Sequence, residues 1–100
     1  MIARVLEDNK AGRPALVIRS DALMMTPWIA TLPFTTDLDL DMPHWLRVEP
    51  TPENGLLHPS RVMVDWPQTV RRSRIVSMIG ALDASTLARV TAQLAAALGV

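Results

Sequence analysis

One arginine and two threonines could place a cation and two hydroxyl groups at the ends of two predicted strands. Arg13 comes directly before Pro14, and Thr35 and Thr36 follow a short apolar segment that ends near Pro33. Proline biases the residue before it towards an extended backbone, so Arg13 should be held at the mouth of a strand. A fixed guanidinium can bind an anion. The residues alone favour a structural or surface role for Arg13 over a catalytic one, and composition does not decide between them.

Other groups that could support catalysis are few. The chain has no glycine-rich phosphate loop and no cysteine, and its histidines are not placed as a metal pair: His44 follows Pro43, and His58 precedes Pro59 in a different segment. Asp37, Asp39 and Asp41 alternate with apolar residues and lack the glycine and glutamate of a calcium loop. We therefore expect no metal site and no cofactor, and we interpret this acidic segment as a solvated or partner-facing loop.

Composition indicates one domain spanning residues 1–100. Ten basic and ten acidic residues cancel, so any contact with RNA must come from local clustering of charge. The apolar share of 49% is high for a short chain and indicates pairing with another subunit. The absence of cysteine, of a long apolar run and of a secretory signal is compatible with a cytoplasmic protein outside the membrane.

Short apolar segments separated by prolines and turn residues predict a small antiparallel β barrel or half-barrel. Pro14 is expected to open the second strand and not to lie inside it. The segment from Thr36 to Pro43 is predicted to be a loop. The expected strands, all within about 1–82, are Met1–Leu6 as an edge strand, Ala15–Ile18, Trp28–Leu32, His44–Val48, Arg61–Trp66 and one strand within Val70–Leu82.

The end of the chain changes to a helical period. Asp83 is a suitable N-cap, and Gly99 supplies a C-terminal stop, which predicts a helix over about 84–98. The apolar residues on one face of this helix are Leu87, Val90, Leu94 and Leu98.

Six short motifs follow one another along the chain: Gly12 to Ile18, Pro33 to Asp37, Asn54 to Leu56, Pro59 to Asp65, Thr69 to Arg74 and Ile79 to Asp83. In this order they resemble the MazF/PemK family of bacterial toxin endoribonucleases over residues 12–99. The resemblance implies a small SH3-like antiparallel barrel with a C-terminal helix, and a homodimer. It also implies the toxin of a type II toxin-antitoxin system, which cleaves single-stranded RNA at short sequence motifs without a metal ion. A cognate antitoxin protein would occupy the RNA groove.

The resemblance also implies roles for individual residues. The catalytic arginine of the family matches Arg13, and its catalytic threonine or serine matches Thr35, with Thr36 as the alternative and as an RNA-binding residue. Asp65 matches an acidic residue that contacts RNA. The next position, commonly polar or cationic in relatives, is Trp66 here, which either stacks on a base or packs in the core.

Relatives usually carry a further motif on the first strand, before the position where this chain begins, so a shortened strand and an exposed sheet edge are expected. Two alternatives therefore stay open. One is a toxin that binds DNA gyrase, as the structurally similar CcdB family does; the other is a shortened, inactive relative that binds only an antitoxin. An SH3-like peptide binder is disfavoured, because the chain has no Tyr and a single Phe.

Overall fold

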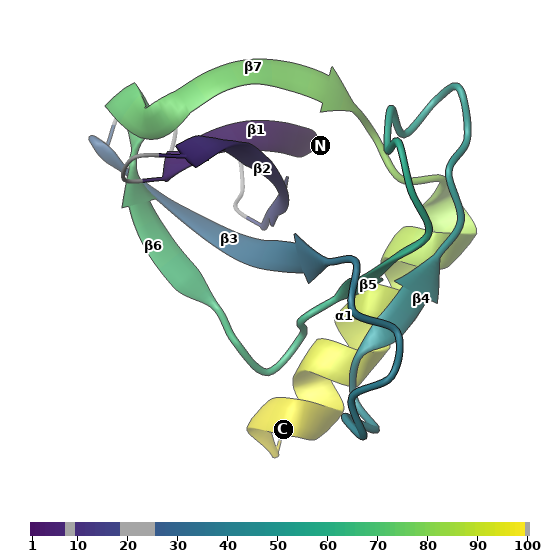
Figure 1. The fold of residues 1–100 in the computed structure, drawn as a ribbon. Helices are drawn as coiled ribbons and strands as arrows, with labels where there is room; N and C mark the ends of the chain where they lie inside the picture. Colours follow the sequence, from purple (N-terminus) through teal and green to yellow (C-terminus); the bar gives the residue numbers. More distant parts are fainter. Residues whose placement is uncertain (8–9, 19–25, 100) are drawn as a thin grey trace.

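The elements of the chain are short antiparallel strands followed by one helix (Figure 1). The computed structural model describes residues 1–7, 10–18 and 26–99. The elements in these ranges are β1 (Ile2–Glu7), β2 (Lys10–Val17), β3 (Trp28–Thr35), β4 (Leu46–Val48), β5 (Ser60–Val62), β6 (Gln68–Arg71), the 3₁₀ turn η2 (Arg72–Arg74), β7 (Ile75–Gly80) and α1 (Ala84–Leu98).

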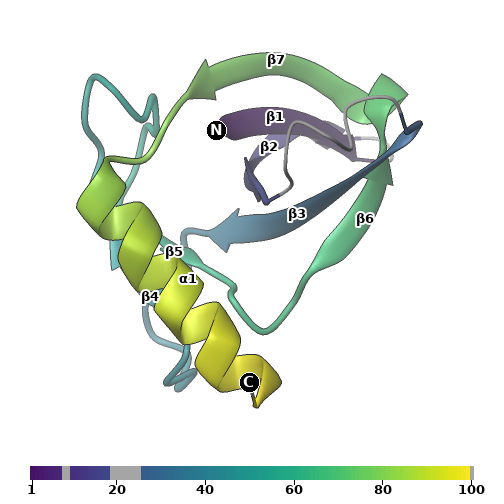
Figure 2. The same cartoon turned by 180° about the vertical axis from the view of Figure 1, so that it is seen from behind.

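The strands form one strongly bent sheet in the order β4-β5-β3-β2-β1-β7, and β6 also pairs with β3. One side of β3 pairs with β2. Its other side pairs first with β6, over Trp28–Thr31, and then with β5, at Phe34 and Thr35. The sheet curls round, as Figures 1 and 2 show, but its two terminal strands, β4 and β7, do not pair with each other. The expected class, mainly β with a C-terminal helix, is confirmed, although the barrel is not closed.

The prediction that Met1–Leu6 forms an edge strand is wrong. β1 lies between β2 and β7, with Ile2 opposite Leu16 on one side and Gly80 on the other. The outer strand here is β7. An apolar run without polar alternation is typical of a strand with neighbours on both sides and cover on both faces.

The prediction that Pro14 opens a strand is also wrong, because Pro14 lies inside β2. The Val17 N–H donates to the Met1 carbonyl (2.8 Å), so the odd-numbered residues of β2 bond to β1. Because bonding direction alternates along a strand, the Pro14 nitrogen faces β3 instead, and the β2–β3 register begins only at Ala15. The missing N–H of proline therefore removes no bond from the ladder.

Pro33 likewise lies inside a strand. β3 was expected to end at Leu32 but continues to Thr35. Pairing with β6 ends at Thr31 and pairing with β5 begins at Phe34, so Pro33 lies where the partner strand changes. Its carbonyl still accepts a hydrogen bond from the Met63 N–H (2.9 Å). The proline thus extends a strand at a point where no donor is required.

Three further strands differ from the prediction in length. β4 is only the end of the segment expected at His44–Val48, and β5 covers only the start of Arg61–Trp66. A turn, in which the Trp66 N–H donates to the Met63 carbonyl (3.1 Å), follows β5. The single strand expected within Val70–Leu82 is two strands, β6 and β7, because η2 turns the chain between them.

The hydrophobic core lies between the bent sheet and α1. It is formed by Ile2, Leu16, Leu32, Phe34, Leu46, Val48, Leu56, Val62, Val64 and Val90. The predicted helix is confirmed at Ala84–Leu98. Val90 is its buried residue and Leu94 packs against the core, whereas Leu87 and Leu98 are largely exposed. The central turns of α1 therefore provide most of its contact with the sheet (Figure 2).

Both ends of α1 have the predicted capping groups. The Asp83 carboxylate accepts hydrogen bonds from the Thr86 N–H (3.0 Å) and the Thr86 hydroxyl (2.6 Å). Gly99 has a φ of +74° and donates its N–H to the Ala96 carbonyl (3.2 Å). These bonds satisfy backbone groups that a helix end leaves without intrahelical partners.

Two glycines with positive φ should differ sharply on substitution. Gly99→Ala should lower the free energy of unfolding by about 1–2 kcal/mol, the cost of a left-handed alanine. Gly55→Ala should cost more, because Gly55 (φ +70°) lies where an added Cβ would be 2.0 Å from the Ile79 carbonyl oxygen, whereas Gly99 has nothing within 4 Å. Denaturant unfolding of both variants measures the difference. Equal losses would mean that the approach of Gly55 to β7 carries no constraint.

Asp83 should make stability depend on pH in the acid range. Hydrogen bonds from the Thr86 hydroxyl, the Thr86 N–H and Ser85 lower the pKa of Asp83 from 3.8 to about 2. Because the folded pKa is the lower one, the stabilisation is present above pH 3.8 and is lost as the pH falls towards about 2. The melting temperatures of wild type and Asp83→Ala should therefore differ at neutral pH and converge in acid. Asp83→Asn, which caps without titrating, is the control, and a constant gap between wild type and Asp83→Ala would contradict the assignment.

Candidate active site

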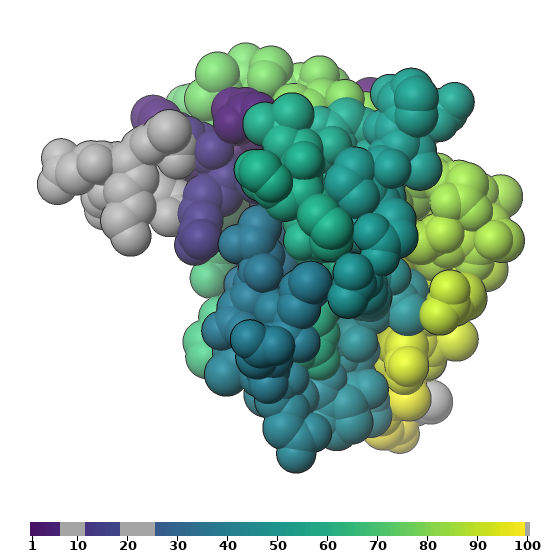
Figure 3. Space-filling model, turned by 45° about the vertical axis from the view of Figure 1, so that its right-hand side comes forward, coloured from purple at the N-terminus to yellow at the C-terminus, as the bar shows by residue number. Residues whose placement is uncertain are grey.

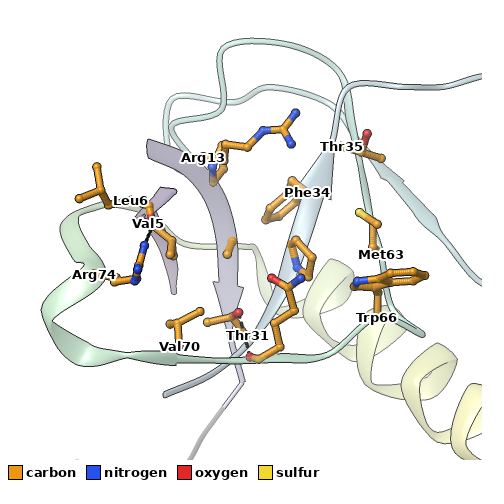
Figure 4. Close-up of a pocket in the computed structure, with 14 residues that line it drawn as sticks. Val5, Leu6, Arg13, Thr31, Phe34, Thr35, Met63, Trp66, Val70 and Arg74 are labelled. Carbon is orange, nitrogen blue, oxygen red and sulfur yellow. Dashed lines mark hydrogen bonds between the residues drawn. The ribbon is translucent and has the colours of Figure 1, made fainter. Parts of the chain in front are cut away.

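A cavity of about 470 Å³ lies against β1, β2 and β3 and is bounded on its far side by β6 and the turn after β5 (Figure 4). Its volume falls within the roughly 300–1,000 Å³ that is usual for ligand sites. The cavity lies on the face of the strands opposite the core: in β2, Ala15 lines the cavity while Leu16 points into the core. Ala15 and Leu16 are thus buried on opposite faces of β2, which explains why neither of these consecutive positions is polar.

Arg13 is on the rim of this cavity and is carried by β2. Its backbone is held opposite Val5 in the β1–β2 ladder, while its side chain is exposed. Within the described part of the chain, the Arg13 guanidinium has no hydrogen-bond or ion-pair partner. Its donors are therefore available to an anion that enters the cavity.

Thr35 lines the same cavity from the end of β3. Its Oγ1 accepts a hydrogen bond from the Asp37 N–H (3.1 Å). This bond fixes the hydroxyl oxygen and leaves the hydroxyl proton to be donated elsewhere. Figure 4 shows Arg13 and Thr35 on the same rim of the cavity, from neighbouring strands. The structure thus brings together the guanidinium and the hydroxyl that the sequence placed on separate segments.

The charge around the cavity is one-sided. Among the described residues that line it, the ionisable ones are Arg13 and Arg74, and none is a carboxylate or an imidazole. The Arg74 Nη1 donates to the Leu6 carbonyl (3.4 Å), which ties this second guanidinium to the end of β1. A chain of zero net charge therefore contains a locally cationic cavity suited to an anionic ligand.

Trp66 forms part of the cavity wall beside Met63 (Figure 4). It is 54% exposed and is not among the buried core residues. An exposed aromatic ring beside a cationic rim is the arrangement that proteins use to stack on unpaired nucleobases. The indole thus lies in the cavity wall and does not pack in the core.

Two other predicted residues lie outside this cavity. Thr36 lines a second cavity of about 120 Å³, which shares Pro14 with the first. Asp65 is exposed, and its Oδ1 accepts a hydrogen bond from the Trp45 indole N–H (2.6 Å). The guanidinium of Arg61 lies over the Trp45 ring at 5.2 Å. Asp65 is therefore next in sequence to the cavity wall but belongs to a neighbouring polar cluster.

The loop from Thr36 to Pro43 is confirmed and is fixed to β5 by Arg61, which donates to the carbonyls of Leu40 (2.6 Å) and Met42 (2.7 Å). Figure 3 shows the blue-to-teal segment that includes this loop on the surface of the molecule, with α1 at the side. The three aspartates of the loop are exposed. No group of three His, Cys, Asp or Glu among the described residues is arranged to hold a metal ion.

Sequence reasoning missed several residues of the cavities. Thr31 and Gln68 line the larger cavity, and the Thr31 hydroxyl donates to the Gln68 carbonyl (3.1 Å), joining β3 to β6. Arg4 lines the smaller one. A charged residue in the otherwise apolar segment from Ile2 to Leu6 was the available signal, whereas nothing in the sequence shows which strands Thr31 and Gln68 join.

The fold and the cavity define a small β protein whose open cationic cavity presents a guanidinium and a hydroxyl to an anion. A family model described as "PemK-like, MazF-like toxin of type II toxin-antitoxin system" matches residues 5–98. The chain is 37% identical, over 89 residues that make up 88% of it and 81% of the relative, to the "Probable endoribonuclease MazF" of Mycolicibacterium smegmatis. The chain therefore belongs to the PemK/MazF toxin family, as the motifs indicated.

Solved structures show the same fold. The "Mycobacterium tuberculosis toxin MazF-mt6" matches with a TM-score of 0.84 at 24% identity, covering 99% of this chain and 96% of that one. An "Endoribonuclease in complex with its cognate antitoxin from Mycobacterial species" matches with a TM-score of 0.80 at 20% identity, covering 99% and 91%. In the residues that the structure describes, no helix is long and apolar enough to cross a membrane.

Proposed function

We propose that this chain is a toxin endoribonuclease that cleaves single-stranded RNA in the larger cavity, with Arg13 and Thr35 acting on one phosphate. The observation that carries the proposal is the meeting of these two side chains on one cationic cavity rim. The toxin endoribonuclease class itself is confirmed by the family match and the 37% identical relative, and a gyrase-binding toxin is not favoured. The proposed site of this cleavage is the cytoplasm.

The chemistry needs neither a metal ion nor a covalent enzyme intermediate. The 2′-hydroxyl of the substrate attacks the adjacent phosphorus, the P–O5′ bond breaks, and the products carry a 2′,3′-cyclic phosphate and a 5′-hydroxyl. The proton of the 2′-hydroxyl passes to solvent, and the leaving oxygen takes one up. Arg13 and Thr35 donate hydrogen bonds to the non-bridging oxygens, whose negative charge increases in the phosphorane. Each such donor is worth about 3–4 kcal/mol of transition-state stabilisation.

Three residues are proposed to bind the RNA on either side of that phosphate. Trp66 stacks on a base inside the cavity. Thr36 donates a hydrogen bond to the strand as it leaves the cavity past Pro14. Asp65, whose Oδ2 has no partner among the described residues, accepts a hydrogen bond from an exocyclic amino group of a base. These contacts would give the enzyme its preference for a short sequence.

The proposal includes two protein partners. A second copy of the chain would pair through the open edge of β7, where Val76 (60% exposed) and Met78 (50% exposed) present apolar surface. A cognate antitoxin would cover the cationic cavity, as expected of a toxin from a type II system. A protein that binds an antitoxin without cleaving RNA is the second candidate, and the cleavage assay separates the two.

The activity is tested by incubating the purified protein with a long RNA in EDTA and analysing the fragment ends. We expect discrete fragments with 2′,3′-cyclic phosphate and 5′-hydroxyl ends, because the proposed mechanism uses hydrogen-bond donors and the 2′-hydroxyl of the substrate. Intact RNA would favour the inactive relative, and cleavage lost in EDTA would contradict metal independence.

Arg13→Ala should lower kcat by about 10²–10³, the usual loss for one donor to a developing anion, with little change in melting temperature. Thr35→Val should behave similarly, and Thr35→Ser should retain activity. Arg47→Ala is the matched control: it removes the same charge from an exposed residue paired with Glu49, outside the cavity. Equal losses for Arg13→Ala and Arg47→Ala would mark Arg13 as non-catalytic, and unfolding of Arg13→Ala would mark it as structural.

Trp66→Ala should weaken RNA binding by about 1–3 kcal/mol, the value of one base stacked on an aromatic ring, and Trp66→Phe should retain much of the affinity. Fluorescence anisotropy with a labelled RNA, deoxy at the cleaved nucleotide, measures this. Trp28→Ala is the control, because Trp28 is similarly exposed (47%) but lies under Arg71, outside the cavity. Unchanged affinity in a folded Trp66→Ala protein would remove the stacking contact.

A further inference from the structure

The smaller cavity is placed to receive the RNA where it leaves the larger one. The two cavities share Pro14. The residues next to the proposed catalytic pair line the smaller cavity: Pro14 follows Arg13, and Thr36 follows Thr35. Because successive strand residues point to opposite faces of a sheet, the smaller cavity lies on the other face of β2 and β3 from Arg13 and Thr35. The pairing of β2 with β3 begins only at Ala15, so the two strands separate beside Pro14, which lines both cavities. An RNA strand with its scissile phosphate between Arg13 and Thr35 can therefore reach the second cavity past Pro14.

Arg4 provides the charge in this second cavity. Its side chain crosses Gly12 on β2 and is anchored by one hydrogen bond, from Nη1 to the Gly12 carbonyl (3.1 Å). Only glycine leaves room for this path, because a Cβ on residue 12 would be 2.5 Å from the Arg4 Cγ. The guanidinium is therefore half-buried and held in place, with further N–H groups available.

No carboxylate among the described residues pairs with Arg4. The described residues that line the cavity are Arg4, His58 and neutral residues. A partly desolvated cation without a counter-charge favours an anionic ligand. The volume of about 120 Å³ is below the range of whole-ligand sites and suits a single phosphate group.

We propose that Arg4, with Thr36 and His58 beside it, binds the phosphodiester next to the scissile one in the substrate RNA. This inference rests on the proposed function, because it takes its ligand from the strand bound in the larger cavity. Arg4 donates charge-assisted hydrogen bonds to the non-bridging oxygens, and the exposed side chain of Leu57 provides an apolar rim for the sugar. The site thereby fixes the register of the strand on the catalytic pair.

The test begins with an RNA oligonucleotide that contains a cleavage site mapped with the wild-type protein. Neutral methylphosphonates replace, one at a time, the linkages on either side of the scissile phosphate. Wild type should lose about tenfold in kcat/KM at one of these linkages. Arg4→Met, which retains much of the aliphatic stem, should lose about tenfold on the unmodified oligonucleotide, mostly through KM, and nothing more at that linkage.

Salt dependence gives a second readout. With an RNA that is deoxy at the cleaved nucleotide, Arg4→Met should reduce the slope of log K against log salt by about 0.7, the value of one phosphate contact on a single strand. Arg47→Met, outside both cavities, should leave the slope and kcat/KM unchanged. His58 is an exposed loop residue, so His58→Ala should fold even if Arg4→Met does not. We expect His58→Ala to raise KM.

The outcomes separate the two proposals. Absence of cleavage by wild type would overturn the proposed function and this inference with it. Two results would overturn the second phosphate site alone, provided that wild type cleaves the RNA. The first is an unchanged kcat/KM for Arg4→Met. The second is a loss of about a hundredfold when Arg4→Met acts on the oligonucleotide with the neutral linkage, because the two effects would then be independent. Normal KM for a folded His58→Ala would exclude His58 from it.

Discussion

The whole arrangement depends on one strand, β3, that changes partners along one side while keeping β2 on the other. Where β6 stops pairing and β5 begins, the sheet must bend, and Pro33 lies at that point because no donor is needed there. The bend directs β5, β4 and α1 towards the core face, and leaves the opposite face of β1, β2 and β3 to β6. The larger cavity lies on that second face, and Thr35 lines it from the end of the bent strand.

This constraint also explains what the sequence predicted and what it did not. The helix was predicted almost to the residue, because Asp83 and Gly99 act locally through hydrogen bonds to nearby backbone groups. The strands were predicted less well, because consecutive residues are buried on both faces of β1, at Ile2 and Ala3, and of β2, at Ala15 and Leu16, and give no polar alternation. Pro14 and Pro33 were taken as strand ends, because the direction of each missing N–H depends on which neighbour the strand has at that residue. The identity of that neighbour is set by the tertiary structure and cannot be predicted from the local sequence.

The candidate site was predictable in a different way. From the residues alone Arg13 resembled a surface arginine, and the ordered family motifs, not any local pattern, linked it to Thr35. The structure adds why the two can cooperate: they are carried by adjacent strands and line one cavity without a carboxylate among its described residues. Arg4 and Thr31 were missed because their surroundings are formed by strands distant in sequence.

Rigidity of the backbone and freedom of the side chains are combined at this site. Arg13 is fixed through its backbone in the β1–β2 ladder, and the Thr35 oxygen is fixed by the Asp37 N–H, so only the exposed Arg13 side chain would have to be ordered by an anion between them. Their donors are nevertheless not consumed by described carboxylates: no aspartate of the loop from Thr36 to Pro43 lines the cavity, and Arg61 fixes that loop through the carbonyls of Leu40 and Met42. Arg13 and Arg74 both line this cavity, and none of its described lining residues is a carboxylate, so the charge there favours an anionic ligand. Zero net charge thus does not exclude an anion-binding surface, because acidic and basic side chains can lie on separate surfaces of one chain.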